Sequence, residues 1–243
     1  YADQVLPMLP KALSNGICSL NPQEERLAFS ALLTLSPEGK LLDFTFRKTV
    51  IRSRVKGVYS EVNALLRGDA DERLREKYRE VLPLLPLMKE LKDLRLALRK
   101  GRGAPDLDSP ESKLVIGPDG RTAEVLPRVS GEAESIIEEF MLLANEAAAT
   151  LARGLAIPFV YRVHEHPDPE RMGTLRETLR KLGLSARSLP EKPKPSDLAQ
   201  LLEEGKDGSY AGILNRLVLR SMAKARYSDQ PLGHYGLVLE NYA

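Results

Sequence analysis

Cysteine is almost absent from this sequence of 243 residues: Cys18 is the only one, and tryptophan is missing altogether. A single cysteine excludes an intramolecular disulfide and a zinc site built from cysteine thiolates. Such scarcity is typical of proteins kept in a reducing compartment. The sequence therefore predicts a cytoplasmic protein.

Long hydrophobic runs are also missing. The apolar run around Phe140 to Leu143 is far shorter than the roughly 20 residues that span a bilayer, and no signal peptide opens the chain. The glycine-rich strings that cradle nucleotide phosphates do not occur either. We therefore expect no membrane partner and no nucleotide cofactor. Because the chain starts at Tyr1 rather than at methionine, and ends at Ala243 directly after a strand-like run, we expect both ends to lie inside a longer protein.

Charge of one sign is not in excess. Lysine and arginine number 36 against 34 aspartates and glutamates, so the formal net charge is only +2. A global basic field is thus not what would attract a nucleic acid. Any nucleic-acid surface must be local.

Two β-hairpins are predicted. Residues 27–35 and 41–51 are rich in β-forming residues, and the turn Ser36-Pro37-Glu38-Gly39 separates them. KLVI and AEVL flank a second turn, Gly117 to Gly120. The opening string VLPMLPKALSNGICSLNP has turn chemistry without a period, which predicts an ordered loop.

Helices follow from the 3.6-residue period. They are expected over residues 55–66, 71–100 (divided in two by Pro83 and Pro86), 132–153, 169–182, 196–204 and 210–226. The segment 132–153 is apolar nearly all round, which predicts a buried central helix. SLPEKPKPS, residues 188–196, is expected to be a mobile surface loop. The irregular order of elements favours an α+β fold: a mixed, mainly antiparallel sheet packed with helices around that central helix.

Acidic residues and histidines are the candidates for catalytic or metal-binding groups. Asp69, Asp71 and Glu72 lie at a helix start, where capping explains them. The string Asp106-Leu107-Asp108 lies in a loop from which carboxylates can approach a metal, yet neither group makes a convincing catalytic set. His164 and His166 are spaced as on one strand face but have no third ligand nearby, so a structural or RNA-contacting role is favoured over metal binding. His234 is equally ambiguous.

Basic residues concentrate in three places. Arg216, Arg220 and Lys224 recur every four positions, which predicts one stripe along the last helix. The other two concentrations are Arg47, Lys48, Arg52, Arg54 and Lys56, and Arg95, Arg99, Lys100 and Arg102. Each patch alone is compatible with a solvated face. Three patches flanked by Tyr59, Tyr227 and Tyr235 are compatible with a groove that follows phosphates and stacks bases.

Five strings resemble, in order, the catalytic (RNB) domain of the ribonuclease II/R family. They are LPMLPKALSNGICSLNP, TVIRSRVKGVYSEVN, ESIIEEFMLLANEAAA, PFVYRVHEHPDPER and LVLRSMAKARYSDQPLGHYGLVLENYA. The resemblance covers almost the whole chain, and SNGICSLNP and YRVHEHPDP are more similar to the ribonuclease R branch than to ribonuclease II. Residues 1–243 are thus expected to be part of one such catalytic domain.

The resemblance implies a Mg²⁺-dependent hydrolase that degrades single-stranded RNA processively from its 3′ end to nucleoside 5′-monophosphates. It also implies that the metal-binding aspartate cluster precedes Tyr1 and that a catalytic arginine run follows Ala243. Oligonucleotide-binding domains are expected to flank the domain. We therefore expect no catalytic residue and no metal ligand in this chain, and no hydrolysis of RNA by this chain alone.

The resemblance also assigns RNA-binding residues. Tyr59 matches a tyrosine that reads the ribose near the scissile bond, and Glu138 or Glu139 matches its acidic partner, a choice that the sequence leaves open. Leu107 stands where the family often has an aromatic residue that clamps the terminal bases. The complete set of expected RNA-binding residues is Tyr59, Glu138, Glu139, Arg216, Arg220, Lys224 and His164.

Two functions remain open at this point. In one, the chain is part of a working exoribonuclease. In the other, it is a non-catalytic RNA-binding module derived from the same domain.

Overall fold

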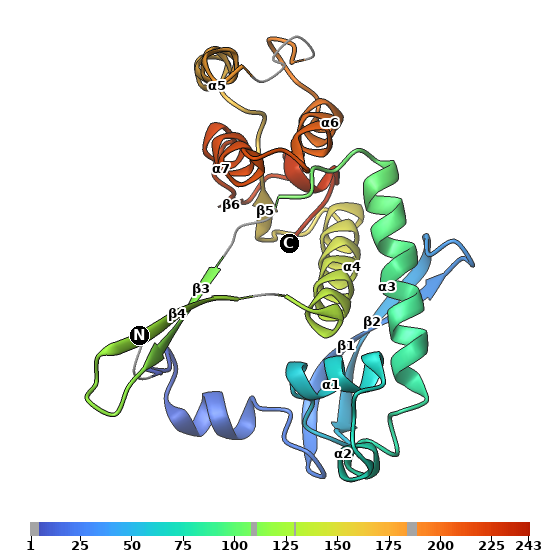
Figure 1. Cartoon of the computed structure of the whole chain (residues 1–243). Helices are drawn as coiled ribbons and strands as arrows, with labels where there is room; N and C mark the ends of the chain where they lie inside the picture. The colour runs from blue at the N-terminus through green and yellow to red at the C-terminus, as the bar shows by residue number, and fades with distance from the viewer. Residues whose placement is uncertain (1–4, 108–110, 129, 184–188) are drawn as a thin grey trace. The chain divides into compact units, whose positions relative to one another are not determined.

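The computed structural model describes residues 5–107, 111–128, 130–183 and 189–243. Its helical elements are η1 (Ala12–Ile17), α1 (Tyr59–Arg67), α2 (Glu72–Lys77), α3 (Leu84–Gly101), α4 (Glu132–Gly154), α5 (Pro169–Lys181), α6 (Pro195–Gly205), α7 (Ala211–Ser221) and η2 (Tyr235–Leu237). Its strands are β1 (Glu25–Leu35), β2 (Leu41–Arg52), β3 (Glu111–Ile116), β4 (Thr122–Arg128), β5 (Tyr161–Val163) and β6 (Arg226–Ser228) (Figure 1).

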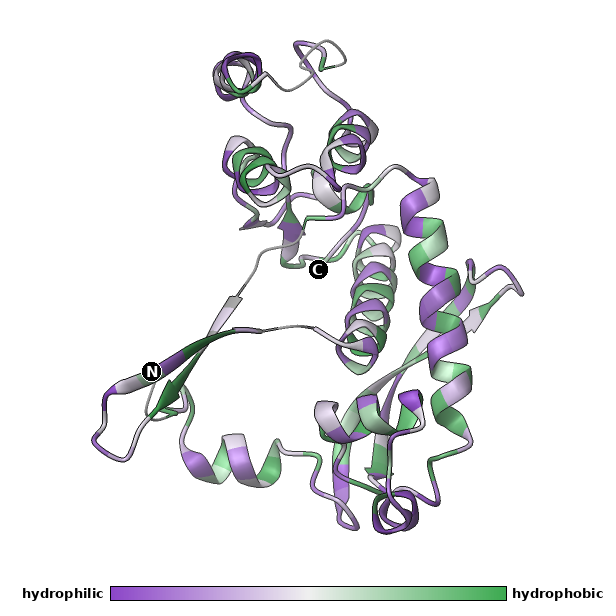
Figure 2. Cartoon of the chain, in the orientation of Figure 1, coloured by the Kyte–Doolittle hydropathy of each residue, from purple (hydrophilic) through white to green (hydrophobic). Residues whose placement is uncertain are grey.

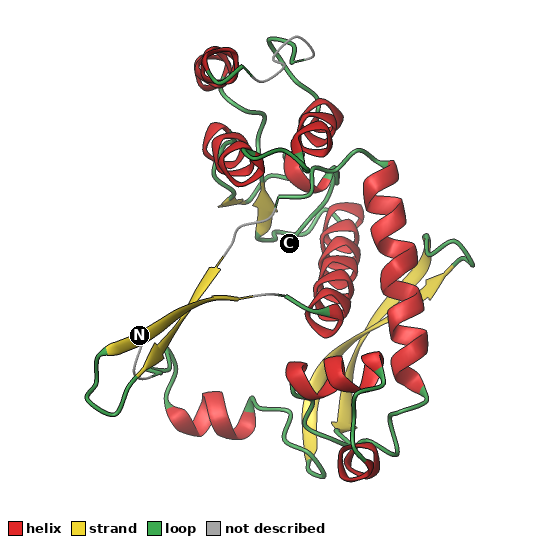
Figure 3. Cartoon of the chain, in the orientation of Figure 1, coloured by secondary structure: helices red, strands yellow, loops and turns green. Residues whose placement is uncertain are grey.

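The strands form three two-stranded antiparallel sheets, β1–β2, β3–β4 and β5–β6 (Figure 3). Both predicted hairpins are confirmed, as is the α+β class. In the first hairpin Leu27 pairs with Val50 and Ser30 with Arg47. The hydroxyls of Ser30 and Thr49 lie 2.7 Å apart across the ribbon, which fixes this register on the polar face.

The chain divides into two compact units. One contains Tyr1–Asp93 and Pro110–Glu139, and the other contains Leu94–Ser109 and Phe140–Ala243. The first holds the hairpins β1–β2 and β3–β4 together with α1 and α2. The second holds α5, α6, α7 and the β5–β6 ribbon. Helices α3 and α4 contribute to both units.

In the first unit, two helix predictions and one loop prediction meet different outcomes. The proline break is confirmed, because α2 ends at Lys77 and α3 begins at Leu84, with Pro86 in its first turn, where no amide hydrogen bond is lost. Helix α1 begins at Tyr59 rather than Val55, because the backbone of Val58 is extended (φ −120°, ψ 127°) and its amide donates to the hydroxyl of Tyr78. The opening loop contains the short helical segment η1, whose start is set by hydrogen bonds to the carbonyl of Pro10.

Helix α4 has the predicted bounds to within one residue, but it is not buried all round. Ala133, Ile136 and Leu143 are buried, whereas Met141 is 57% exposed. Because apolar residues occur on nearly every side of this helix, the sequence predicted that the helix is completely buried. Among the described residues, neighbours cover only part of the helix.

The second unit is built around a cluster of apolar side chains from α5, α6 and α7. Its members are Met172, Leu175, Leu179, Leu189, Leu198, Leu201, Leu214, Val218, Met222 and Tyr235. Helix α5, drawn mostly purple in Figure 2, is hydrophilic outside this contact. Asp168 caps it by accepting from the amides of Glu170 and Arg171, and Gly183, at φ +71°, follows its end, as predicted.

The proline-lysine segment before α6 differs from the expected mobile surface loop. Ser188 lies outside the described residues, but Leu189 is only 5% exposed and belongs to the core cluster. The carbonyl of Pro193 accepts a 2.8 Å hydrogen bond from the hydroxyl of Tyr235. The proline and lysine content of the segment predicted a solvated loop. The contacts that hold it come from residues far away in the sequence, so its composition could not show them.

Candidate nucleic-acid interface

Tyr59 is the first residue of α1 and is 44% exposed. The backbone just before it is held by Tyr78, whose hydroxyl accepts from the amide of Val58 (3.0 Å) and donates to Glu61 (2.6 Å). Burial, followed by the bond to Glu61, raises the pKa of Tyr78 above its usual value. The ring of Tyr59 is therefore presented to solvent from a fixed helix start.

Helix α1 is tied to the first turn of α4. Asn63 donates from Nδ2 to Oε2 of Glu134 (2.9 Å), and its Oδ1 accepts from the amide of Ala133 (2.8 Å). Tyr59 lies one turn before Asn63 on α1, and Glu138 lies one turn after Glu134 on α4, so each shares a helix face with one member of this contact. The contact thus joins the face of α1 that carries Tyr59 to the face of α4 that carries Glu138.

The two candidate glutamates have different environments. Glu138 is exposed, whereas Glu139 is only 2% exposed. A side chain that reads a ribose must be reachable from solvent. The structure therefore favours Glu138 over Glu139 in the choice that the sequence left open.

The predicted basic stripe on the last helix is shorter than expected. Arg216 and Arg220 are exposed on α7, but α7 ends at Ser221 and Lys224 lies in an extended segment. The helix stops because Met222, 3% exposed, leaves it with ψ 156° and packs into the core. The chain beyond pairs as β6 with β5. Sequence periodicity alone extended the helix to Arg226.

In the third basic concentration, Lys100 and Arg102 are exposed, but Arg95 is not. Arg95 is 4% exposed and donates to Glu146 at 2.9 Å. A buried, paired guanidinium is structural. The concentration around β2 is exposed; within it Arg52 donates to the carbonyl of Gln23, and Arg54 lies 3.8 Å from Glu80.

His164 is 7% exposed, and its Nδ1 accepts from the amide of Gly236 (3.1 Å). Its ring centroid lies 5.0 Å from that of His234. Burial lowers the pKa of His164, opposed in part by the carbonyl of Ala223, and burial followed by the nearby His164 lowers the pKa of His234 to about 4. Both imidazoles are thus neutral near pH 7. Of the roles weighed for His164, the structural one is favoured, because this residue holds the 233–239 segment beside β5.

Within the described ranges, the acidic residues that the sequence singled out do not converge. Asp71 caps α2 by accepting from the amide of Leu74 (2.7 Å), as predicted, and Asp69 pairs with Arg67. Leu107 packs against the core of the second unit, while Asp108 lies outside the described residues. No group of three or more His, Cys, Asp or Glu side chains that could hold a metal ion is found in the part of the chain that the structure describes.

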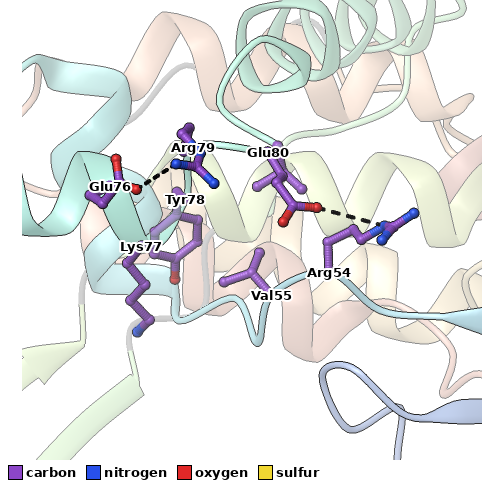
Figure 4. Close-up of a pocket in the computed structure, with 8 residues that line it drawn as sticks. Arg54, Val55, Glu76, Lys77, Tyr78, Arg79 and Glu80 are labelled. Atoms are coloured by element: carbon purple, nitrogen blue, oxygen red, sulfur yellow. Dashed lines mark hydrogen bonds and ion pairs between the residues drawn. The ribbon is translucent and has the colours of Figure 1, made fainter.

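Two hollows lie in the first unit. The pocket around Tyr78, between the pairs Arg54–Glu80 and Arg79–Glu76 (Figure 4), has a volume of about 40 Å³. That space suits one or a few water molecules and not a nucleotide. A second hollow of about 680 Å³ is lined by Glu61, Asp69, Ala70, Asp71, Arg73, Leu74 and Lys77. It holds both charge signs and does not identify a ligand.

Sequence reasoning missed two features. Arg162 and Tyr227 face each other on β5 and β6, with the guanidinium carbon 4.8 Å from the ring centroid. Asn63 was not singled out either, although a polar side chain between Val62 and Leu65 on an amphipathic helix was a usable signal. The pairing of Arg162 with Tyr227, which lie 65 positions apart, gave no signal in the sequence. None of the described helices is both long enough and apolar enough to cross a membrane.

Comparisons with known proteins agree on one family. The chain is 38% identical over 248 residues to ribonuclease R of Escherichia coli and 37% identical over 240 residues to ribonuclease R 1 of Lactococcus lactis, covering 100% and 99% of this chain. It spans 30% and 29% of these relatives' lengths, respectively.

A solved structure of Mycoplasma genitalium RNase R in complex with ribose methylated single-stranded RNA has a TM-score of 0.89 at 30% identity, over 97% of this chain and 36% of that one. Yeast Ssd1, described as a pseudonuclease, shares the fold at 19% identity with a TM-score of 0.68, over 96% of this chain and 28% of that one. The model of the RNB domain family matches residues 1–243. This chain therefore belongs to the RNB domain family.

Proposed function

We propose that this chain is the RNA-holding part of a hydrolytic 3′-to-5′ exoribonuclease that degrades single-stranded RNA processively to nucleoside 5′-monophosphates. The observation that carries the proposal is the match of the whole chain to the RNB domain, together with 38% identity to a ribonuclease R. Both compact units then belong to one catalytic domain, and the enzyme works in the cytoplasm.

Within this function Tyr59 and Glu138 read the ribose. The 2′-hydroxyl that distinguishes RNA from DNA can both donate and accept a hydrogen bond. A phenol and a carboxylate placed around it can therefore recognise the sugar whatever the base. The exposure of both side chains, and the Asn63 contact that joins their helices, support this assignment.

Arg216, Arg220 and Lys224 contact phosphates in this proposal. All three are exposed in the second unit. His164 and Glu139, which were also expected to bind RNA, are buried, and His164 instead holds the 233–239 segment through its hydrogen bonds.

The family implies Mg²⁺, but the described residues do not supply a site for it, since they contain no suitable cluster of ligands. We therefore assign no hydrolytic step to this chain. The proposal is that an aspartate cluster before Tyr1 and an arginine run after Ala243 complete the site. It follows that the 243-residue chain alone does not hydrolyse RNA.

The direct test uses poly(A) oligoribonucleotides labelled at either end, with millimolar Mg²⁺ and the full-length protein. A 3′-to-5′ exonuclease releases the 3′ label at once as a mononucleotide and shortens the 5′-labelled strand progressively. Internal cleavage products, or release of the 5′ label first, would contradict the proposal. Mononucleotide release by the 243-residue chain alone would contradict the assignment of the metal site to its flanks.

A non-catalytic RNA-binding module is the second candidate. One observation favours keeping it: the fold is shared by yeast Ssd1, a pseudonuclease, so the fold does not guarantee catalysis. This candidate predicts RNA binding without release of mononucleotides in the same assay.

A further inference from the structure

The outward faces of β5 and β6 present a tyrosine and an arginine to each other. Arg162 and Tyr227 are directly opposite in the antiparallel register. The guanidinium carbon of Arg162 lies 4.8 Å from the centroid of the Tyr227 ring, within the range of a cation–π contact. Tyr227 is nevertheless 68% exposed, so most of its ring surface remains open to solvent.

The pair sits on a firmly held strand. Tyr161 and Val163, on either side of Arg162, are 4% and 1% exposed and belong to a small buried cluster with Ala149 and Ala152 of α4. The other edge of β5 is also occupied, because the amide of Arg162 donates to the carbonyl of Tyr242 (2.9 Å). An exposed ring carried by such a strand is pre-positioned for binding.

The local charge suits a polyanion. Arg226 is paired with Glu165 at 3.0 Å, whereas among the described residues Arg162 has no carboxylate within ion-pair distance. Lys224, exposed, lies three residues before Tyr227, within about 10 Å along the chain. The ring is thus accompanied by the positive charge of Arg162, which no carboxylate of the described residues pairs.

We propose that Tyr227, backed by Arg162, is a stacking platform for a base of single-stranded RNA, with Lys224 contacting a neighbouring phosphate. This inference rests on the proposed function and adds a binding position that the ribose-reading pair does not provide. An aromatic ring stacks on any base because every base has a π-face, which suits an enzyme indifferent to sequence. The guanidinium fixes the ring and attracts the strand.

The first experiment measures the affinity of the purified full-length protein for a labelled oligo(A), with EDTA present so that the strand is not hydrolysed. Tyr227→Ala is expected to weaken binding by about ten-fold or more, the usual effect of losing one base–aromatic stack. Tyr227→Trp should bind at least as well as the wild type. The matched control is Tyr210→Ala, since Tyr210 is 45% exposed in the same unit and should leave affinity unchanged.

The second experiment reports stacking directly. This sequence contains no tryptophan, so Tyr227→Trp introduces one fluorophore into the chain at the platform. Oligo(A) should quench its emission, whereas an abasic strand with the same phosphates should not. Equal affinity of Tyr227→Ala and wild type, or equal quenching by both strands, would overturn the platform.

The two experiments separate this inference from the proposed function. If the wild type releases mononucleotides with Mg²⁺ while Tyr227→Ala binds oligo(A) normally, only the platform fails. If the wild type binds oligo(A) through Tyr227 but releases nothing, the platform stands and the exonuclease fails. Absence of any binding to oligo(A) would contradict both.

Discussion

Asn63 completes the N-terminus of a helix to which it does not belong. Gly131, which precedes α4, has no side chain to accept from the first free amides of that helix. The Oδ1 of Asn63 accepts from Ala133 instead (2.8 Å), while Glu134 reaches back to the amide of Gly131 (3.0 Å). The cap of α4 is therefore shared with α1, which also carries Tyr59.

The close approach at this cap makes Gly131 sensitive to substitution. A Cβ at Gly131 would lie 2.4 Å from Nδ2 of Asn63, whereas a Cβ at Gly101 would meet nothing within 4 Å. Gly131→Ala should lower the free energy of unfolding by about 1–3 kcal/mol, and Gly101→Ala should be neutral or slightly stabilising. Urea denaturation of both variants measures the difference. Equal effects of the two substitutions would show that the cap tolerates the methyl group.

The histidine pair predicts that acid destabilises the protein. The pKa of His234 is lowered to about 4 from 6.5, so its neutral form is favoured by folding. Its stabilising contribution is complete above pH 6.5 and is lost as the pH falls toward 4. Between pH 7 and pH 5 the loss from His234 alone is about 2 kcal/mol.

His234→Gln is the variant that tests this origin. The substitution removes the titrating group, so the free energy of unfolding should change less between pH 7 and pH 5 than in the wild type. The matched control is His166→Gln, the same substitution at an exposed histidine. A wild-type slope that survives in His234→Gln would assign the effect to other groups.

Sugar discrimination should depend on Tyr59 and Glu138. Glu138→Ala should reduce the preference for ribose over deoxyribose near the scissile bond by about one to two orders of magnitude, because a hydrogen bond with a charged partner contributes about 1.5–3 kcal/mol. Tyr59→Phe should reduce it by about two- to ten-fold, because a hydrogen bond between neutral groups contributes about 0.5–1.5 kcal/mol. RNA cleavage itself should continue. Chimeric oligonucleotides with one deoxyribose stepped through the last positions measure the preference in the full-length enzyme.

Tyr210→Phe is the control for this experiment, since it removes an exposed phenol from a different part of the chain. It should leave the ribose preference unchanged. If Tyr59→Phe and Glu138→Ala also leave it unchanged in folded protein, the two side chains do not read the sugar.

The exposed cations of α7 and the following segment should set part of the salt dependence of RNA binding. Each phosphate contact removed from a single strand lowers the log–log slope by about 0.7. Neutralising Arg216, Arg220 and Lys224 together should therefore lower the slope by about 2. Lys206→Gln, a change at an exposed lysine beyond α6, is the control. If the slope is unchanged in the triple variant, these residues form a solvated face and do not contact phosphates.

Local pattern in the sequence determined much of this fold. The alternation and turn residues of 27–51 predicted the β1–β2 hairpin, and Asp168, Pro169 and Gly183 predicted the bounds of α5. These features depend on residues close together in the chain, whose steric and hydrogen-bonding preferences act without help from the rest of the protein. The resemblance of long strings likewise predicted the family.

Only the tertiary structure decided which residues are buried and which are paired with residues from distant segments. Met222 leaves α7 because burying its side chain and pairing β6 with β5 outweigh continuing the helix to Arg226. The sequence placed Arg95 in a phosphate-binding patch, but in the fold its guanidinium is paired with Glu146. Glu138 and Glu139 are the same residue type, and the fold buries only Glu139. Burial and pairing depend on neighbours brought together by the fold, so a periodicity read along one segment cannot contain them.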